Sequence, residues 1–256
     1  DEPISFPNTI PMMILAKIAR KYVKVLLSGE GADEIFGGYL RYNRLIEQKI
    51  TSDKLLLSNS FCSPAQIASV FNFSGKNQLA ERKLLVKKLN KNTPAYKLSV
   101  YDIKTFLPSL LLRQDKMGMA SNLENRFPFL DPQLVVSALG LADKEKMTST
   151  GTKIYLKKIA DKYLPKEIVY RKKIGFGLPI SDWLKDKNGL GKYLSIFTNP
   201  NIKRDFFSYK NVSKLISEHL TGKRDHSEML WVLTNLEIWT KIFVDKEDPK
   251  RIWRRL

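Results

Sequence analysis

Carboxylates and glycines alternate in one short segment, Ser28-Gly29-Glu30-Gly31-Ala32-Asp33, which continues as Glu34-Ile35-Phe36-Gly37-Gly38-Tyr39. Glycines allow backbone N–H groups to approach an anion closely. Carboxylate oxygens are the ligands that hard divalent cations prefer. The combination predicts a loop that binds a nucleotide together with a metal ion. A glycine-rich turn without a ligand would contain the same residue types and is the alternative.

The elements around this loop support the first interpretation. The loop follows Val23-Lys24-Val25-Leu26-Leu27, whose branched apolar side chains predict a buried parallel strand. Ligands bind at the carboxyl ends of such strands in α/β folds. Apolar spacing predicts helices over residues 10–22, 39–50, 64–71, 79–89, 95–106, 109–121, 133–139, 152–163 and 227–244, with irregular segments at 175–179 and 189–201. Because one strand leaves its backbone groups unpaired, further strands are expected before residue 1.

Composition limits the function classes. The 256 residues are 43% hydrophobic, and no run of about 18 apolar residues would span a membrane. The net charge is +18, from 44 Lys and Arg against 26 Asp and Glu. These basic residues are scattered except at 250–255, which favours a solvated basic surface over a nucleic-acid site, with a polyanion-binding module as the alternative. The lone Cys62 excludes an intramolecular disulfide and fits the cytoplasm. His226 is expected to cap or pack at a helix start.

Three blocks of the sequence carry a family resemblance. The first is the Ser28–Tyr39 segment with the strand before it. The second runs from Leu110 to Asp131 and contains Leu-Leu-Arg-Gln-Asp-Lys-Met-Gly-Met-Ala and Leu-Glu-Asn-Arg-Phe-Pro-Phe-Leu-Asp. The third is Arg171-Lys172-Lys173-Ile174-Gly175-Phe176-Gly177-Leu178-Pro179. The closing helix of the chain, which contains Glu237, adds to the resemblance. In this order the blocks resemble the synthetase domain of the glutamine-hydrolysing asparagine synthetase family.

The resemblance implies a fold and a domain organisation. The fold is an α/β, adenine-nucleotide alpha-hydrolase-like (PP-loop) synthetase domain, of which this chain is the mostly helical C-terminal part. Residues 1–50 are expected to end the nucleotide-binding sheet region, and residues 51–256 to form a mainly helical remainder. The family's glutaminase domain and its Ser-Gly-Gly-x-Asp-Ser pyrophosphate loop are not in this sequence. The chain is therefore expected to be a truncation or a short paralogue, inactive alone.

The resemblance also implies an activity. The family adenylates a carboxylate with ATP and Mg²⁺, and then aminolyses the acyl-adenylate with ammonia from glutamine. Aspartate is the expected acceptor, giving asparagine, AMP and pyrophosphate, in a cytoplasmic enzyme that could be a homodimer. A sugar acid or another carboxylate is the alternative acceptor. A further alternative is a non-catalytic remnant that packs against a partner chain.

Individual positions carry these implied roles. The catalytic candidates are Glu30, Glu124 and Lys173. The residues implied to bind ATP or pyrophosphate are Ser28, Gly29, Gly31, Asp33 and Asp115, and Asp33 is implied to hold the metal. Structural alternatives stay open: an ion pair of Glu124 with Arg126 or a neighbouring Lys, and, for Arg113 and Asp115, an Arg–Asp salt bridge between helices. Asp131 is expected to cap the helix that begins at Pro132.

Overall fold

The computed structural model describes residues 2–255, except residues 4, 5, 73–78, 174, 176, 199, 201 and 202. Ile174 and Phe176 of the third block therefore lie outside the described residues, as do the side chains of residues 253–255. The chain divides into two compact units. Residues 9–59 and 77–175 form the unit that we call the strand unit, and residues 1–8, 60–76 and 176–256 form the helical unit. This division does not follow the expected segments 1–50 and 51–256, which stay a prediction.

The strand unit holds the only two strands that the described residues form, and these pair in parallel. The strands are β1 (Val25–Leu27) and β2 (Glu124–Arg126), with Leu26 opposite Asn125. The strand predicted at 23–27 is thus confirmed over three residues. Its expected burial is wrong, because Leu27 is 70% exposed. The sequence does not predict β2, whose residues lie in the part expected to be mainly helical, and the further strands expected before residue 1 stay a prediction.

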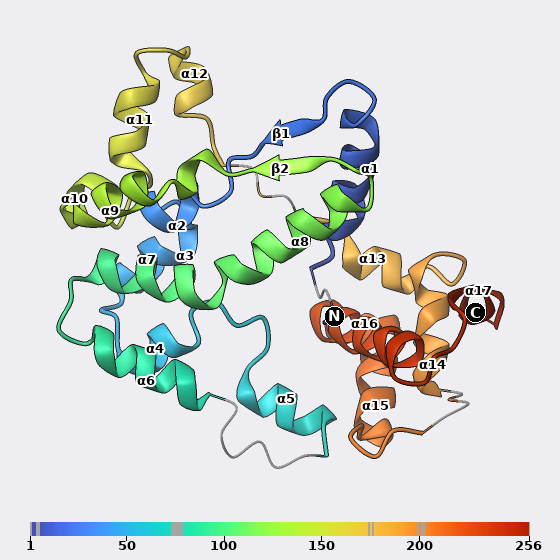
Figure 1. The fold of residues 1–256 in the computed structure, drawn as a ribbon. Coiled ribbons are helices and arrows are strands. Elements are labelled where there is room, and N and C mark those ends of the chain that lie inside the picture. The colour runs from blue at the N-terminus through green and yellow to red at the C-terminus, as the bar shows by residue number, and fades with distance from the viewer. Residues whose placement is uncertain are drawn as a thin grey trace. The chain divides into compact units, whose positions relative to one another are not determined.

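Helices lie along the β2 side of this pair of strands and at one of its ends (Figure 1). Helix α8 (Leu107–Met119) contacts β2 and also packs against α1 (Thr9–Ala19) and α7 (Pro94–Thr105). Gly118 permits the close approach of β2, because a Cβ at this position would lie 2.6 Å from the Leu123 carbonyl oxygen. The remaining helices of the unit are α2 (Ala32–Phe36), α3 (Leu40–Glu47), α4 (Ser52–Leu56), α6 (Ala80–Leu89), the 3₁₀ helix η1 (Pro128–Leu130), α9 (Pro132–Gly140), α10 (Asp143–Lys146), α11 (Ile154–Ala160) and α12 (Lys166–Val169).

Two apolar clusters hold these helices together. The larger one joins α3, α4, α6 and α7 through the buried residues Tyr42, Leu55, Leu56, Val86, Leu89, Ala95, Leu98, Tyr101 and Met147. The smaller one, formed by Ile35, Phe36 and Ala138, fixes α2 against α9. Helix α2 carries the acidic part of the glycine-rich loop, so this second cluster sets the position of the candidate site. As expected, Asp131 caps α9 by accepting hydrogen bonds from the backbone N–H groups of Gln133 and Leu134.

The helical unit is built around α16 (Ser227–Phe243), which packs against α13 (Ile180–Lys185) and α15 (Tyr209–Leu220). Its other elements are α5 (Pro64–Val70), the 3₁₀ helix η2 (Leu190–Leu194), α14 (Ser195–Thr198) and α17 (Pro249–Arg255). The segment expected to be irregular at 189–201 thus contains η2 and α14. In α16, Glu237 accepts from Arg204 Nε at 3.0 Å, and Arg204 Nη1 donates to Asp245 at 2.9 Å. This ion network gives Glu237 a structural role.

Two elements of the strand unit, α1 and β1, expose apolar side chains. Ile14, Leu15 and Ile18 of α1 are exposed, as are Val25 and Leu27 of β1. The predicted helix at 10–22 is therefore confirmed in type, but much of its apolar face is not covered by the described residues. In the described part of the chain, none of the helices has both the length and the apolarity that crossing a membrane requires.

Candidate active site

The glycine-rich loop begins where β1 ends, at the carboxyl end of the parallel pair. Ser28 continues the ladder by donating its backbone N–H to the Arg126 carbonyl oxygen at 2.8 Å. Gly31 then takes the left-handed conformation, with φ of 91°, immediately before α2. A Cβ there would lie 2.3 Å from Cδ2 of Leu130, so only glycine fits this turn. The backbone thus turns sharply and directs its carboxylates to two different places.

The first carboxylate, Glu30, faces α8. Arg113 Nη2 donates to Glu30 Oε1 at 3.0 Å, and Gln114 Nε2 lies 3.4 Å from Oε2. Gln114 Nε2 also donates to the Ser28 hydroxyl at 3.1 Å. The Glu30 side chain stays 22% exposed, so a ligand can still reach it. Gly29 beside it has open space where a Cβ would be.

Arg113 is the fixed partner in this contact. Its side chain is almost fully buried in the strand unit, and burial lowers the pKa of its guanidinium although the Glu30 carboxylate raises it. Arg113 pairs with Glu30 of the loop, which differs from the Arg–Asp salt bridge between helices that the sequence left open. Asp115 is exposed on α8. Its predicted role in binding ATP or pyrophosphate stays a prediction.

The second carboxylate, Asp33, receives two ammonium groups. Lys153 Nζ and Lys173 Nζ each lie 2.9 Å from Asp33 Oδ1. Lys173 also donates to the Gly38 carbonyl oxygen at 3.1 Å. Burial would raise the pKa of the Asp33 carboxyl, but the ammonium groups of Lys153 and Lys173 together lower it below its usual value. The structure therefore brings Asp33 and Lys173 together, as two of the three sequence blocks predict.

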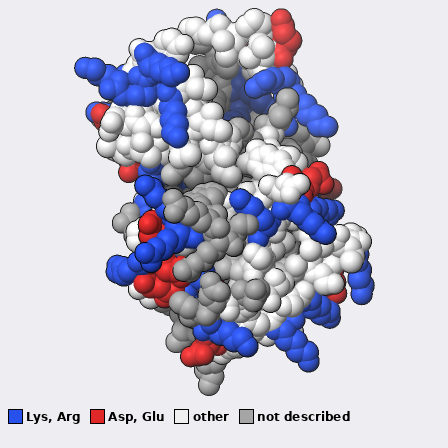
Figure 2. All heavy atoms as spheres, turned by 90° about the vertical axis from the view of Figure 1, so that its right-hand side faces the viewer, with Lys and Arg blue, Asp and Glu red and all other residues white. Residues whose placement is uncertain are grey.

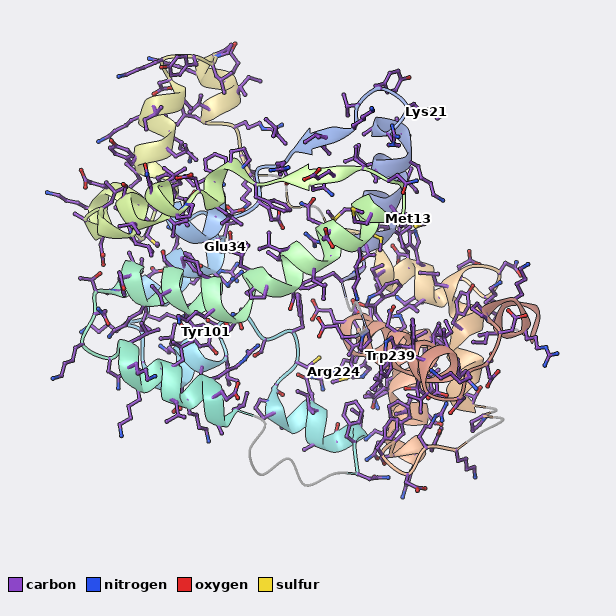
Figure 3. The ribbon with its side chains drawn as sticks, in the orientation of Figure 1. Met13, Lys21, Glu34, Tyr101, Arg224 and Trp239 are labelled. Carbon is purple, nitrogen blue, oxygen red and sulfur yellow. The ribbon has the colours of Figure 1, made fainter. Side chains whose placement is uncertain are left out.

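A third acidic residue, Glu34, points the other way, into the interior of the strand unit (Figure 3). It is buried and accepts a hydrogen bond from the Tyr39 hydroxyl at 2.6 Å. Burial raises the pKa of Glu34 to about 7, because the charged form loses its hydration. Glu34 thus anchors Tyr39 beneath the site and does not face a ligand.

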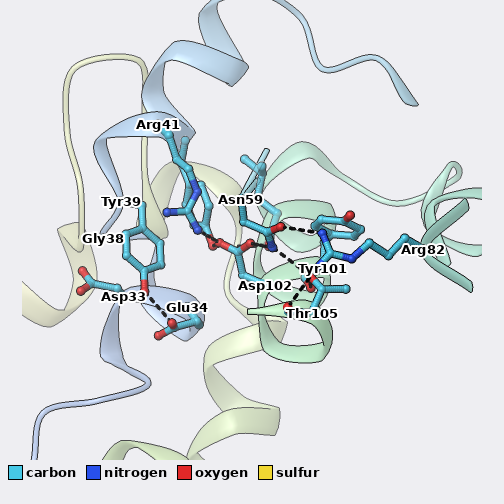
Figure 4. A network of polar contacts seen from close by, with 12 residues as sticks. Asp33, Glu34, Gly38, Tyr39, Arg41, Asn59, Arg82, Tyr101, Asp102 and Thr105 are labelled. Atoms are coloured by element: carbon cyan, nitrogen blue, oxygen red, sulfur yellow. Dashed lines mark hydrogen bonds and ion pairs between the residues drawn. The ribbon is translucent and has the colours of Figure 1, made fainter. Parts of the chain in front are cut away.

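The aromatic ring of Tyr39 lies next to the ammonium group of Lys173. Lys173 Nζ lies 5.0 Å from the centre of the Tyr39 ring, and the Arg41 guanidinium stacks on the same ring at 3.9 Å. Arg41 is held in turn by an ion pair with the buried carboxylate of Asp102, to which Asn59 donates at 2.9 Å. Figure 4 shows this network reaching from α2 to α7. These polar contacts therefore connect the glycine-rich loop to α7.

The third catalytic candidate, Glu124, has Arg126 as its charged neighbour. It begins β2, opposite Val25, and forms an exposed ion pair with Arg126 at 2.7 Å. Side chains alternate along a strand, and the intervening Asn125 faces α8 through a 2.9 Å hydrogen bond to the Gln114 carbonyl oxygen. Glu124 is thus on the side of β2 away from α8, the helix whose residues Arg113 and Gln114 contact Glu30. The ion pair is the alternative that the sequence left open, and a catalytic role for Glu124 stays a prediction.

Sequence reasoning missed Lys153, Gln114 and Glu34 as parts of this site. Gln114 lies inside the second block, next to Arg113. Its place in that block could therefore have identified it as a residue of the site. Glu34 lies inside the first block, but its burial is a property of the packing of α2. Lys153 lies between the second and third blocks in a chain rich in lysine, and nothing in its local sequence distinguishes it.

The histidines lie elsewhere, in the helical unit. His226 is buried at the start of α16 and contacts Glu218 at 2.7 Å through Nε2. It packs there as expected, whereas the helix-start N–H of Ser227 is bound by the Asp225 side chain at 2.8 Å. His226 and Glu218 line a cavity of about 270 Å³ together with Arg224. Within the described residues, no group of three or more His, Cys, Asp or Glu side chains is arranged to hold a metal.

Comparison with known proteins gives a consistent family. The family model for asparagine synthase matches residues 1–241. The chain is 32% identical over 285 residues to asparagine synthetase (glutamine-hydrolyzing) 1 of Bacillus subtilis, covering 96% of this chain and 45% of that relative. It is 32% identical over 185 residues to asparagine synthetase (glutamine-hydrolyzing) 3 of the same organism, covering 65% and 30%. It is 31% identical over 193 residues to asparagine synthetase (glutamine-hydrolyzing) 1 of Saccharomyces cerevisiae, covering 69% and 26%. The chain thus spans less than half the length of these relatives.

Proposed function

This chain belongs to the asparagine synthase family, and from that membership we propose that it carries part of an ATP-dependent, amide-forming active site. One observation supports the proposal most directly. Glu30, Asp33 and Lys173 come from two separate sequence blocks, and the strand unit gathers them around one loop at the end of β1. A purely structural glycine turn has no need of exposed acidic and basic groups at this place.

The proposed reaction has two steps. An oxygen of the acceptor carboxylate attacks the α-phosphorus of ATP, and the bond to the β-phosphate breaks to release pyrophosphate. Ammonia then attacks the acyl carbon and AMP leaves, because AMP is a far better leaving group than the oxyanion of a free carboxylate. Aspartate is the proposed acceptor, with ammonia supplied by glutamine hydrolysis, and a sugar acid is the alternative. The protein contributes positioning and charge neutralisation.

We assign the residues to these steps as follows. Ser28, Gly29 and Gly31 lie where the backbone can contact the nucleotide, and Gly29 leaves open space there. Lys173 neutralises charge on the phosphates. Glu30 takes the proton from the attacking amine, held in place by Arg113. Glu124 as a catalytic carboxylate and Asp115 as a residue that binds ATP or pyrophosphate have less structural support.

Asp33 fits Mg²⁺ only as one ligand among several. Its Oδ1 atom is bound by two lysines, which leaves Oδ2 for a metal. Mg²⁺ is commonly held by one or two carboxylates together with substrate phosphates, so a single carboxylate oxygen is compatible with it. Bound there, Mg²⁺ would offset the negative charge of the phosphates, and phosphate oxygens and water would supply its other ligands.

The exposed apolar side chains of the strand unit bear on how the site is completed. Ile14, Leu15 and Ile18 of α1 are exposed, and among the described residues the edge of β1 away from β2 pairs with no other strand, so further chain could cover them. We propose that the rest of the phosphate site is formed by chain that packs here. The proposal also includes a glutaminase part elsewhere in the whole enzyme. It further includes a cytoplasmic location and a homodimer.

The polyanion-binding alternative receives less support. Figure 2 shows Lys and Arg side chains spread over the face drawn, with Asp and Glu among them. This is a mixed charged surface, as the scattered lysines predict, and such surfaces keep proteins soluble without a specific partner.

Exchange of labelled pyrophosphate into ATP tests the proposal in the full-length gene product. Exchange should require aspartate and should fall by about 100-fold in Lys173→Ala, the usual effect of losing one group that stabilises transition-state charge. Lys172→Ala is the matched control and should retain most of the rate. Exchange that no carboxylate stimulates would contradict adenylation. Equal losses in the two variants would mean that only the general positive field matters.

A further inference from the structure

We propose that the helical unit binds a free α-amino acid with a carboxamide side chain, in the cavity of about 270 Å³ that Glu218, Arg224 and His226 line. All the residues that line this cavity belong to the helical unit, so the site lies within one unit of the chain. Cavities for drug-sized ligands are commonly larger than about 300 Å³, so this one suits a smaller molecule. The inference does not rest on the proposed function, because these residues take no part in the proposed reaction.

Helical spacing assembles two walls of the cavity. Asn211, Lys214 and Glu218 follow one another at intervals of three and four residues along α15, so their side chains share one face of that helix. The residues that α15 buries lie on a different face and are Val212, Ile216 and His219. Gln66 and Ser69, three residues apart on α5, line the cavity from a second helix. Asn211 Nδ2 joins the two helices by donating to the Ser69 carbonyl oxygen at 2.7 Å.

The turn from α15 to α16 forms the third wall. Gly222 takes the left-handed conformation, with φ of 73°, which is typical of the residue after a helix end. The backbone N–H of Arg224 then donates to the Glu218 carbonyl oxygen at 3.2 Å, and the backbone N–H of His226 donates to His219 Nδ1 at 3.3 Å. These bonds fix the backbone from which the Arg224 and His226 side chains reach the cavity.

The charged groups of the cavity match the two charges of an α-amino acid. Glu218 pairs with His226 through Oε2 at 2.7 Å, and not with Lys214 one turn before it, so Oε1 is left for an ammonium group. The hydrogen bond from His226 lowers the pKa of the Glu218 carboxyl, which keeps it ionised. Lys214 and Arg224 bring two positive charges, and both side chains are exposed, so a carboxylate can reach them.

The uncharged groups of the cavity indicate the side chain of the ligand. Gln66 Oε1 accepts from the Ser63 backbone N–H at 2.8 Å, which leaves its Nε2 group as a donor. Asn211 uses Nδ2 on Ser69, which leaves its Oδ1 atom as an acceptor. A carboxamide has both an acceptor and donors and can therefore bind to both. An adjoining cavity of about 250 Å³ shares Gln66 and Met229 with the first and gives room for the longer side chain of glutamine.

Calorimetric titration of L-asparagine into the full-length gene product tests this inference. Arg224→Met removes a charge at an exposed position, and we expect asparagine to bind at least about tenfold more weakly, as for the loss of a charge-assisted hydrogen bond. Lys210→Met changes an exposed lysine of α15 that does not line the cavity, and this matched control should not alter the affinity. Asparagine bound at the proposed reaction site would not respond to Arg224→Met. An affinity that this variant leaves unchanged would therefore overturn the inference.

A ligand analogue tests the role of Glu218. Succinamic acid is asparagine without its ammonium group, and it should bind at least about tenfold more weakly than asparagine. Glu218→Gln should weaken the binding of asparagine but not that of succinamic acid, because only asparagine has the group that Glu218 binds. Equal affinity of the unaltered protein for the two compounds would contradict an amino-acid site.

A second measurement needs no variant and so does not depend on the folding of one. Phenylglyoxal, which modifies arginine, is applied with and without asparagine, and the modification of each arginine is read by mass spectrometry. Asparagine should protect Arg224 but not Arg251, which is exposed on α17. Equal modification of Arg224 in both conditions would overturn the inference, whereas the proposed function is tested separately by pyrophosphate exchange into ATP.

Discussion

Arg113 donates from Nη2 to Oε1 of Glu30 at 3.0 Å, from a position on α8 where the guanidinium is almost fully buried. A buried guanidinium has few alternative partners, so the orientation of the Glu30 carboxylate is set by the helix and not by the loop. The second oxygen is contacted by Gln114 at 3.4 Å. Glu30 is therefore held in one place before any ligand arrives, which is what a group that takes a proton from an attacking amine requires.

We expect Glu30→Gln to separate chemistry from binding. The amide oxygen of glutamine can still accept from Arg113, so the free energy of unfolding should fall by about 1 kcal/mol only. Affinity for ATP with Mg²⁺ should change little. Amide formation should fall by about 100-fold or more, because the variant cannot accept a proton. Amide formation at the original rate would rule out Glu30 as the base.

Asp33→Asn should have the reverse effect. The amide removes the negative charge on which two lysines and the proposed Mg²⁺ depend. Nucleotide affinity should weaken by about tenfold, the range for losing a charge-assisted contact, and most of the loss should appear in a Mg²⁺ titration. If Glu30→Gln abolishes Mg²⁺-dependent binding and Asp33→Asn does not, the two carboxylates have been assigned the wrong way round.

Gly29 and Gly38 should differ sharply on substitution by alanine. The Cβ of Gly38→Ala would lie 1.8 Å from Asp33 Oδ1, so the carboxylate must move, and we expect a loss of about 1–3 kcal/mol in unfolding free energy. Gly29→Ala projects into open space, and its stability should change by less than about 0.5 kcal/mol. Nucleotide affinity should nevertheless fall in Gly29→Ala, since the nucleotide is proposed to approach there. Denaturant unfolding and nucleotide titration measure the two effects, and unchanged affinity in Gly29→Ala would contradict the proposed approach.

Some of this site could be predicted from the sequence, for identifiable reasons. Branched apolar residues at Val25–Leu27 indicate a strand whatever its partner, and the run of glycines after it indicates a sharp turn. By contrast, β2 consists of Glu, Asn and Arg, which carry no strand signal. Its pairing depends on α8 and on the close approach that Gly118 allows.

The ionic contacts divide in the same way. Motif order indicates that Asp33 and Lys173 belong together, whereas Lys153 is brought to Asp33 by the turn before α11. The raised pKa of Glu34 depends on burial, which the acidic sequence around it does not reveal. The sequence thus predicts which charged residues of the motifs belong to the site. The packing of the helices determines which ion pairs and hydrogen bonds these residues form.

The helical unit should lose stability in mild acid through His219. This side chain is buried, with Nε2 facing the Ser181 carbonyl oxygen at 3.2 Å and Nδ1 accepting from the backbone N–H of His226 at 3.3 Å. Burial lowers the pKa of His219, although Asp225 lies 3.4 Å from Nδ1 and favours the charged form. Above pH of about 6.5 the ring is neutral in both folded and unfolded chains and contributes no pH dependence.

Below that pH the unfolded chain takes up a proton that folded His219 resists, so the free energy of unfolding should fall as the pH drops. Glu34, whose pKa burial raises to about 7, titrates in the same range with the opposite sign, so comparison with a variant of His219 is needed to assign the slope. His219→Gln keeps one donor and one acceptor but cannot titrate, so its stability should vary less between about pH 6.5 and 5. Denaturant unfolding at a series of pH values measures this slope. An unchanged slope in His219→Gln would show that the acid sensitivity of the fold arises elsewhere.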